Sequence, residues 1–93
     1  MKKLAIYPGS FDPITKGHLD IIKRSVELFQ EFKIGVLINS SKKNWFTIEE
    51  RVNLIKDILK KENLNVEVVS FEGLVVDFMN EQNADILIRG LRA

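Results

Sequence analysis

An α/β fold built on a doubly wound, Rossmann-like parallel sheet is predicted for this chain, and three observations predict it. Short apolar segments alternate with segments whose apolar residues recur at spacings of three and four. Short connections between such segments imply right-handed crossovers and parallel strands covered on both faces. Gly, Pro or Asn marks several of the breaks. The predicted order is β-α-β-α-β-α-β, in one domain over residues 1–93.

The first strand is predicted over 4–7, where an apolar run ends at Pro8-Gly9. Thr15 is the expected N-cap of the helix that follows, because a threonine hydroxyl can accept a hydrogen bond from a free backbone N–H of the first turn. The buried stripe of this helix is formed by Leu19, Ile22, Val26 and Phe29.

The second strand is predicted over 34–38, and a polar loop leads from it to a helix over 48–61. Thr47 with Glu50 three residues later is typical of a capping box at the start of that helix. Trp45 and Phe46 are expected to anchor the loop on the helix through their apolar side chains. The remaining elements are a strand over 66–71, a helix over 74–82 after Gly73, and a strand over 85–88.

Composition is that of a small globular domain and excludes several classes of site. Of 93 residues, 45% are hydrophobic and 29% charged, and the net charge of +1 does not indicate a nucleic-acid or membrane surface. Without cysteine and with one histidine, the chain has no disulfide framework and no thiolate or histidine-cluster metal site. It also has no apolar run of transmembrane length and no signal-peptide core, so a cytoplasmic location is expected.

The turn from Gly9 to His18 joins a strand to a helix start, which is where parallel α/β sheets bind phosphates. Free N–H groups of the first helical turn face an anion there, Gly17 lets a phosphate approach the backbone, and His18 places an imidazole beside it. Polar groups that follow the other strands should converge on the same crevice. They include Lys42, Arg89 and Arg92.

The chain has no Walker A sequence, no Gly-x-Gly-x-x-Gly and no close set of carboxylates, which argues against a kinase or a nicotinamide dehydrogenase. The remaining anion donors suit a reaction whose nucleophile is already ionised, where the protein aligns reactants and stabilises charge on a phosphoryl group. Nucleotidyl transfer to a phosphate is such a reaction.

The order of residues in this turn resembles the T/HxGH signature of nucleotidyltransferases, which reads Thr15-Lys16-Gly17-His18 here. Together with Ser41-Lys42-Lys43, the segment 46–51 and Arg89-Gly90-Leu91-Arg92, it resembles bacterial phosphopantetheine adenylyltransferase over nearly the whole chain. The resemblance implies the nucleotidyltransferase type of Rossmann-like fold. It also implies transfer of AMP from ATP to 4′-phosphopantetheine, giving dephospho-coenzyme A and pyrophosphate in coenzyme A synthesis.

The same resemblance implies roles for individual residues. His18 would stabilise the transition state, and Mg²⁺ would be carried by the ATP phosphates, with no metal site on the protein. ATP would be contacted by Ser10, Phe11, His18, Gly90, Leu91 and Arg92. 4′-Phosphopantetheine would be held by Ser10, Lys42, Leu74, Val75 and Arg89. A homo-oligomer, hexameric in the family, is expected, with no nucleic-acid or membrane partner.

Members of that family continue beyond the Arg-Gly-Leu-Arg segment, so this chain is expected to be the N-terminal portion of the fold, truncated after the fourth strand. Two alternatives therefore stay open. One is a non-catalytic fragment that binds ligand or a partner subunit. The other is a different T/HxGH enzyme, such as a nicotinamide-mononucleotide adenylyltransferase or a glycerol-phosphate cytidylyltransferase.

Overall fold

The computed structural model describes residues 3–38 and 44–90, and over these it confirms the alternating fold. Seven elements follow one another as β1 (Leu4–Gly9), α1 (Lys16–Leu28), β2 (Glu31–Ile38), α2 (Ile48–Lys61), β3 (Glu67–Glu72), α3 (Val75–Gln82) and β4 (Ile86–Leu87). All strand pairs are parallel, and the sheet order is β3-β2-β1-β4. β2 and then β3 thus extend the sheet on one side of β1, and β4 pairs with the other side of β1.

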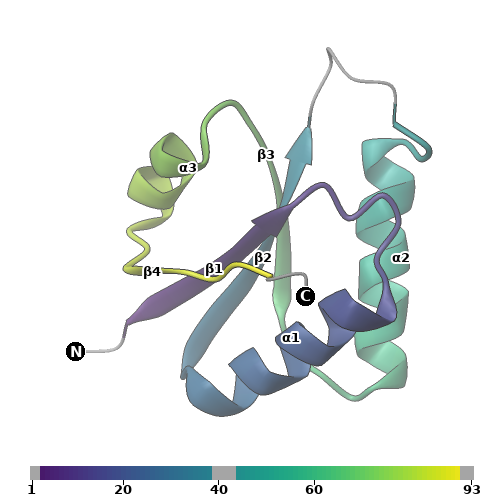
Figure 1. The fold of residues 1–93 in the computed structure, drawn as a ribbon, viewed down its shortest axis with the longest axis horizontal. Coiled ribbons are helices and arrows are strands. Elements are labelled where there is room, and N and C mark those ends of the chain that lie inside the picture. Colours follow the sequence, from purple (N-terminus) through teal and green to yellow (C-terminus); the bar gives the residue numbers. More distant parts are fainter. Residues whose placement is uncertain (1–2, 39–43, 91–93) are drawn as a thin grey trace.

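Helices cover both faces of the sheet. Figure 1 shows α1 and α2 on one face and α3 on the other. The buried residues divide in the same way, because successive side chains of a strand point to opposite faces. The larger cluster includes Tyr7, Phe11, Ile22, Ile34, Val36, Ile55 and Leu59, and the smaller one is Leu4, Ile6, Phe71 and Phe78.

Both predicted helix starts are confirmed. The Thr15 side chain accepts from the His18 N–H, and the Thr47 side chain accepts from the Glu50 N–H at 3.1 Å. In each case the residue at the third helical position also bonds back to the N-cap N–H, which completes a capping box. These caps involve neighbours three residues apart, so local sequence suffices to specify them.

The strand bounds differ from those predicted. β2 begins at Glu31, earlier than expected, because its first six residues pair with β1 from Leu4↔Glu31 to Gly9↔Val36. β4 is shorter, because only Ile86 and Leu87 pair with β1. Leu74 is the N-cap of α3 rather than its first residue, since its backbone is extended (φ −80°, ψ 141°).

Within the described residues, no helix is both long and apolar enough to cross a membrane.

Candidate functional site

A cavity of about 590 Å³ opens at the carboxyl ends of β1 and β4. These two strands are where the strand order reverses, the position at which open α/β sheets bind ligands. The cavity is lined by Tyr7, Pro8, Thr15, Gly17, His18, Asp20, Ile21, Arg24, Arg89 and Gly90. It therefore brings together His18, Arg89 and Gly90, which the sequence analysis selected from the two ends of the chain.

His18 lies in the first turn of α1 and is held by Thr15. The Thr15 N–H donates to His18 Nδ1 at 2.9 Å, and Thr15 Oγ1 lies 3.1 Å from the same nitrogen. A backbone N–H can only donate, so Nδ1 must accept, which places the proton of the neutral ring on Nε2. The cap thus sets the tautomer in which Nε2–H is the donor.

Phe11 and Tyr7 pack against the same imidazole. The Phe11 and His18 ring centroids are 4.8 Å apart, and Tyr7 meets Phe11 edge-on at 5.2 Å. Phe11 is 3% exposed, and its ring packs against that of His18, so its side chain supports the imidazole. That Phe11 contacts the nucleotide stays a prediction. Burial raises the pKa of the Tyr7 phenol above its ordinary value of 10.0, so the phenol stays protonated near neutral pH.

Two glycines line the cavity for different reasons. A Cβ at Gly17 would meet only Thr15 Oγ1, at 3.6 Å, so the fold has room for a side chain there. A Cβ at Gly90 would lie 3.0 Å from Ile21 Cδ1 and 3.3 Å from the Tyr7 hydroxyl, so this glycine lets the chain pass close over β1 and α1. Gly17 is the one whose missing side chain leaves space for a ligand.

A second cavity of about 480 Å³ adjoins the first and is mostly apolar in its lining residues. It is lined by Pro8, Val75, Val76, Met79, Leu87, Ile88, Arg89 and Gly90. Arg89, Gly90 and Pro8 belong to both cavities, so Arg89 lies where two ligands could meet. Within the described part of the chain, Arg89 has no hydrogen-bond or ion-pair partner.

Leu74 does not line this cavity. It is 67% exposed and precedes α3, and the residues that α3 contributes are Val75, Val76 and Met79. Val76 and Met79 are not among the site residues that the sequence predicts. Their positions on one short helix beside the end of β4 could have indicated them, but only once the pairing of β4 with β1 was known.

Ser10 is half-buried and does not line the first cavity, but its backbone is tightly held. Arg51 Nη1 donates to the Ser10 carbonyl at 2.8 Å and to the Leu37 carbonyl at 3.0 Å. Arg51 is 2% exposed, and it joins the ends of β1 and β2 from α2. Nothing in the helical pattern marks Arg51 as more than a surface charge, because its neighbours in space lie on other elements.

The expectation that Trp45 anchors its loop through an apolar side chain is wrong. Trp45 is 86% exposed, and what holds this segment is its backbone. Asp12 accepts the Trp45 N–H at 2.6 Å and the Phe46 N–H at 2.8 Å. The predicted site residues Lys42, Leu91 and Arg92 lie outside the described residues.

Over residues 3–38 and 44–90, no group of three His, Asp or Glu side chains is placed to hold a metal ion. Asp20 is the acidic residue that lines the first cavity, and its carboxylate pairs with Arg24 Nε at 3.2 Å. That Mg²⁺ arrives with nucleotide phosphates stays a prediction.

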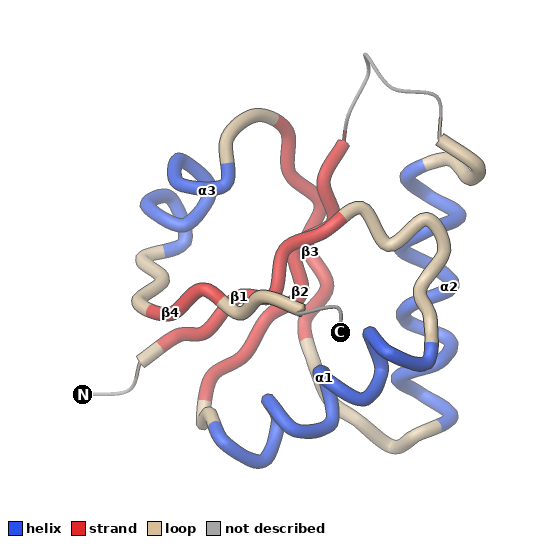
Figure 2. The backbone as a smooth tube through the Cα atoms, viewed as in Figure 1, coloured by secondary structure: helices blue, strands red, loops and turns tan. Residues whose placement is uncertain are grey.

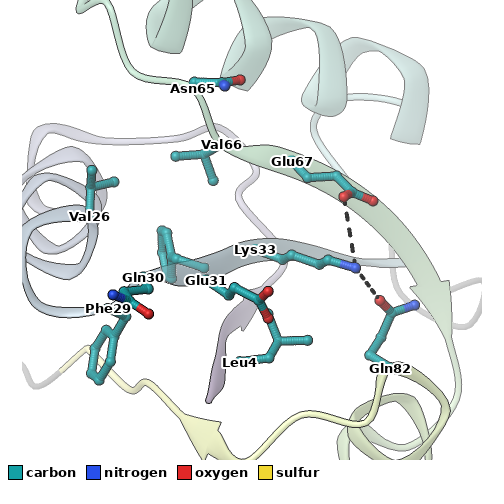
Figure 3. A pocket seen from close by; sticks show the side chains of 11 residues that line it. Leu4, Val26, Phe29, Gln30, Glu31, Lys33, Asn65, Val66, Glu67 and Gln82 are labelled. Atoms are coloured by element: carbon teal, nitrogen blue, oxygen red, sulfur yellow. Dashed lines mark hydrogen bonds and ion pairs between the residues drawn. The ribbon is translucent and has the colours of Figure 1, made fainter. Parts of the chain in front are cut away.

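A third cavity, of about 550 Å³, lies at the amino ends of β1 and β2 (Figure 3). Among the described residues that line it, Lys33 is already engaged, since its Nζ donates to Gln82 Oε1 at 2.9 Å and lies 3.7 Å from Glu67 Oε1. This cavity is similar in volume to the first, but Lys33 in it is already paired with residues of the fold.

Comparison with known proteins gives three findings. A family model described as cytidylyltransferase-like matches residues 6–93. The chain is 58% identical over 91 residues to a phosphopantetheine adenylyltransferase of Clostridium botulinum (strain Eklund 17B / Type B), covering 98% of this chain and 57% of that protein. It is 57% identical over 90 residues to the phosphopantetheine adenylyltransferase of Clostridium tetani, covering 97% of this chain and 56% of that protein.

A crystal structure of a bifunctional NMN adenylyltransferase/ADP ribose pyrophosphatase from Francisella tularensis matches with a TM-score of 0.65 and 21% identity. The match covers 88% of this chain and 25% of that one. At this identity it shows the shared fold alone. The chain spans a little over half the length of the curated relatives it matches.

Proposed function

The chain belongs to the cytidylyltransferase-like family, and we propose that within it this protein transfers AMP from ATP to 4′-phosphopantetheine, giving dephospho-coenzyme A and pyrophosphate. The proposal follows the names of the 55–58% identical relatives. Its main structural support is the first cavity, where a helix N-terminus, an imidazole of fixed tautomer and an arginine without a partner in the described chain meet at the strand switch point.

The chemistry needs little from the protein beyond alignment and charge stabilisation. A phosphate oxygen of 4′-phosphopantetheine attacks the α-phosphorus of ATP, a new P–O bond forms, and the bond to the β-phosphate breaks as pyrophosphate leaves. The attacking phosphate is already an anion near neutral pH, so no general base is required. Mg²⁺ would accompany the ATP phosphates and offset their charge.

His18 and Arg89 have separate parts in this proposal. His18 Nε2–H would donate to the oxygen on which charge develops during transfer, while the first turn of α1 and Gly17 receive the ATP phosphates. Arg89 would hold the acceptor phosphate where the two cavities join, and the apolar second cavity with Val75 would take the pantetheine arm. Lys42, Leu91 and Arg92 keep their predicted contacts as part of the proposal.

A homo-oligomer, hexameric as the resemblance implies, and a cytoplasmic location belong to the same proposal. Sedimentation of the purified chain would measure the assembly.

The direct test incubates the purified chain with ATP, Mg²⁺ and 4′-phosphopantetheine and follows dephospho-coenzyme A and pyrophosphate together. Equal formation of both products is expected. CTP with glycerol phosphate, and ATP with nicotinamide mononucleotide, serve as competing substrate pairs, and faster turnover of either would transfer the assignment to that reaction. Binding of 4′-phosphopantetheine without product, in a chain shown by circular dichroism to be folded, would instead favour a binding-only fragment.

A further inference from the structure

The carboxylate of Asp12 joins the turn after β1 to a segment that lies 33 and 34 residues further along the chain. It accepts the N–H groups of Trp45 and Phe46, the two residues that precede the N-cap of α2. A carboxylate that accepts two backbone N–H groups makes charge-assisted bonds, which are shorter and stronger than neutral ones. Figure 2 shows the loop after β1 running beside α2 before it turns into α1.

The residue before Asp12 has an unusual backbone. Phe11 adopts φ 47°, in the left-handed region that a residue with a bulky side chain seldom occupies without support from its surroundings. That support comes from both sides, because Arg51 holds the Ser10 carbonyl and Asp12 is bonded to the Trp45 and Phe46 backbone. Phe11 is thereby held between two tertiary attachments.

The ring of Phe11 is what this backbone places against the imidazole. Its centroid lies 4.8 Å from that of His18 at a tilt of 60°, and Phe11 is buried while His18 is half-exposed at the cavity. Thr15 fixes one edge of the imidazole, and the tilted Phe11 ring packs against it. We infer that Asp12 is a positioning residue for His18, acting through the Phe11 turn rather than by touching substrate.

The inference can be tested on the chain without any substrate, because His18 is its single histidine and Trp45 its single tryptophan. In Asp12→Asn one acceptor oxygen becomes an NH₂ group that faces a backbone N–H. We expect the Trp45 and Phe46 amides to exchange with solvent roughly tenfold faster or more. We also expect the His18 ring ¹⁵N and ¹H signals to shift or broaden. Asp57→Asn, which alters an exposed carboxylate on α2, should change neither.

Phe11→Leu separates the two steps, since it removes the aromatic ring and leaves Asp12 in place. It should shift the His18 ring signals while the Trp45 and Phe46 amides stay protected. Faster amide exchange in Asp12→Asn with unchanged His18 signals would reduce Asp12 to a structural tie and overturn the inference. Unchanged exchange at both amides would overturn it as well.

The kinetic consequence rests on the proposed function. Asp12→Asn should lower kcat by roughly tenfold, with a much smaller change in the KM for ATP, and this loss should vanish in a His18→Ala background. Losses that multiply in the double variant would mean that Asp12 acts independently of His18. If the parent chain shows no turnover, the proposed function fails, while the NMR comparison still decides the role of Asp12.

Discussion

The two ends of the sheet carry cavities of similar volume, about 590 Å³ at the carboxyl end and about 550 Å³ at the amino end, yet they differ in how their charges are used. At the amino end Lys33 is engaged by Gln82 and Glu67 (Figure 3). At the carboxyl end Arg89 has no partner within the described residues. A charge that the fold does not neutralise distinguishes the candidate site, whereas volume does not.

The two long helices show the same contrast at their N-termini. The first turn of α2 carries Glu49 and Glu50, which complement the positive end of its own dipole. The first turn of α1 carries no acidic residue, and Gly17 and His18 of this turn line the cavity. An external anion can therefore complement the positive end of the α1 dipole, whereas Glu49 and Glu50 already complement that of α2.

The largest effect should come from His18→Ala, which removes the donor at the carboxyl end. Turnover should fall roughly a hundredfold or more, the scale of one transition-state donor, while circular dichroism shows an unchanged fold. The matched change at the amino end, Lys33→Met, should leave turnover within about twofold. Near-normal turnover in His18→Ala would remove this residue from the mechanism, and equal losses in both variants would erase the distinction between the two ends.

A pair of glycine variants separates space kept for a ligand from space needed for packing. Gly17→Ala should raise the KM for ATP about tenfold with no loss of stability, because the fold has room for the methyl group and alanine favours the helix. Gly35→Ala should cost about 1–3 kcal/mol in the free energy of unfolding, because its Cβ would lie 2.7 Å from Phe78 Cε2. Urea titrations and ATP saturation curves check both, and a destabilised Gly17→Ala would show that Gly17 serves the fold.

The Lys33 pairings at the amino end should contribute little to stability. Lys33 is partly exposed and its ion pair with Glu67 spans 3.7 Å, so Lys33→Met should change the free energy of unfolding by less than about 1 kcal/mol. Urea unfolding in low and high salt measures this. A loss of several kcal/mol in the free energy of unfolding would mean that the Lys33 pairings are needed for the stability of the fold.

Tyr7, which lines the carboxyl-end cavity, should make the free energy of unfolding depend slightly on pH. Burial raises the pKa of Tyr7 in the folded chain above 10.0, so the unfolded chain releases this proton first and stability is lost as pH rises above 10. Tyr7 is the only tyrosine, so its ionisation can be followed by absorbance. Tyr7→Phe should show a weaker decline in unfolding free energy between pH 9 and 11, and an equal decline would assign the effect to other groups.

Much of the fold was predictable because its signals are local. The helix starts at Thr15 and Thr47 depend on side chains that reach three residues along the chain, and the alternating pattern predicted a parallel sheet. The grouping of His18, Arg89 and Gly90 followed from the rule that parallel strands end at one edge. These predictions needed the order of elements and no knowledge of side-chain contacts.

The sequence by itself determined the element types, both capped helix starts and the edge of the sheet where the site forms, because hydrophobic period and capping act over a few residues. Only the tertiary structure decided that β4 is two residues long, that Trp45 is exposed, and that Asp12 and Arg51 hold the turn beside His18. Those features depend on partners tens of residues away, which become neighbours only once β4 and β2 have paired on either side of β1.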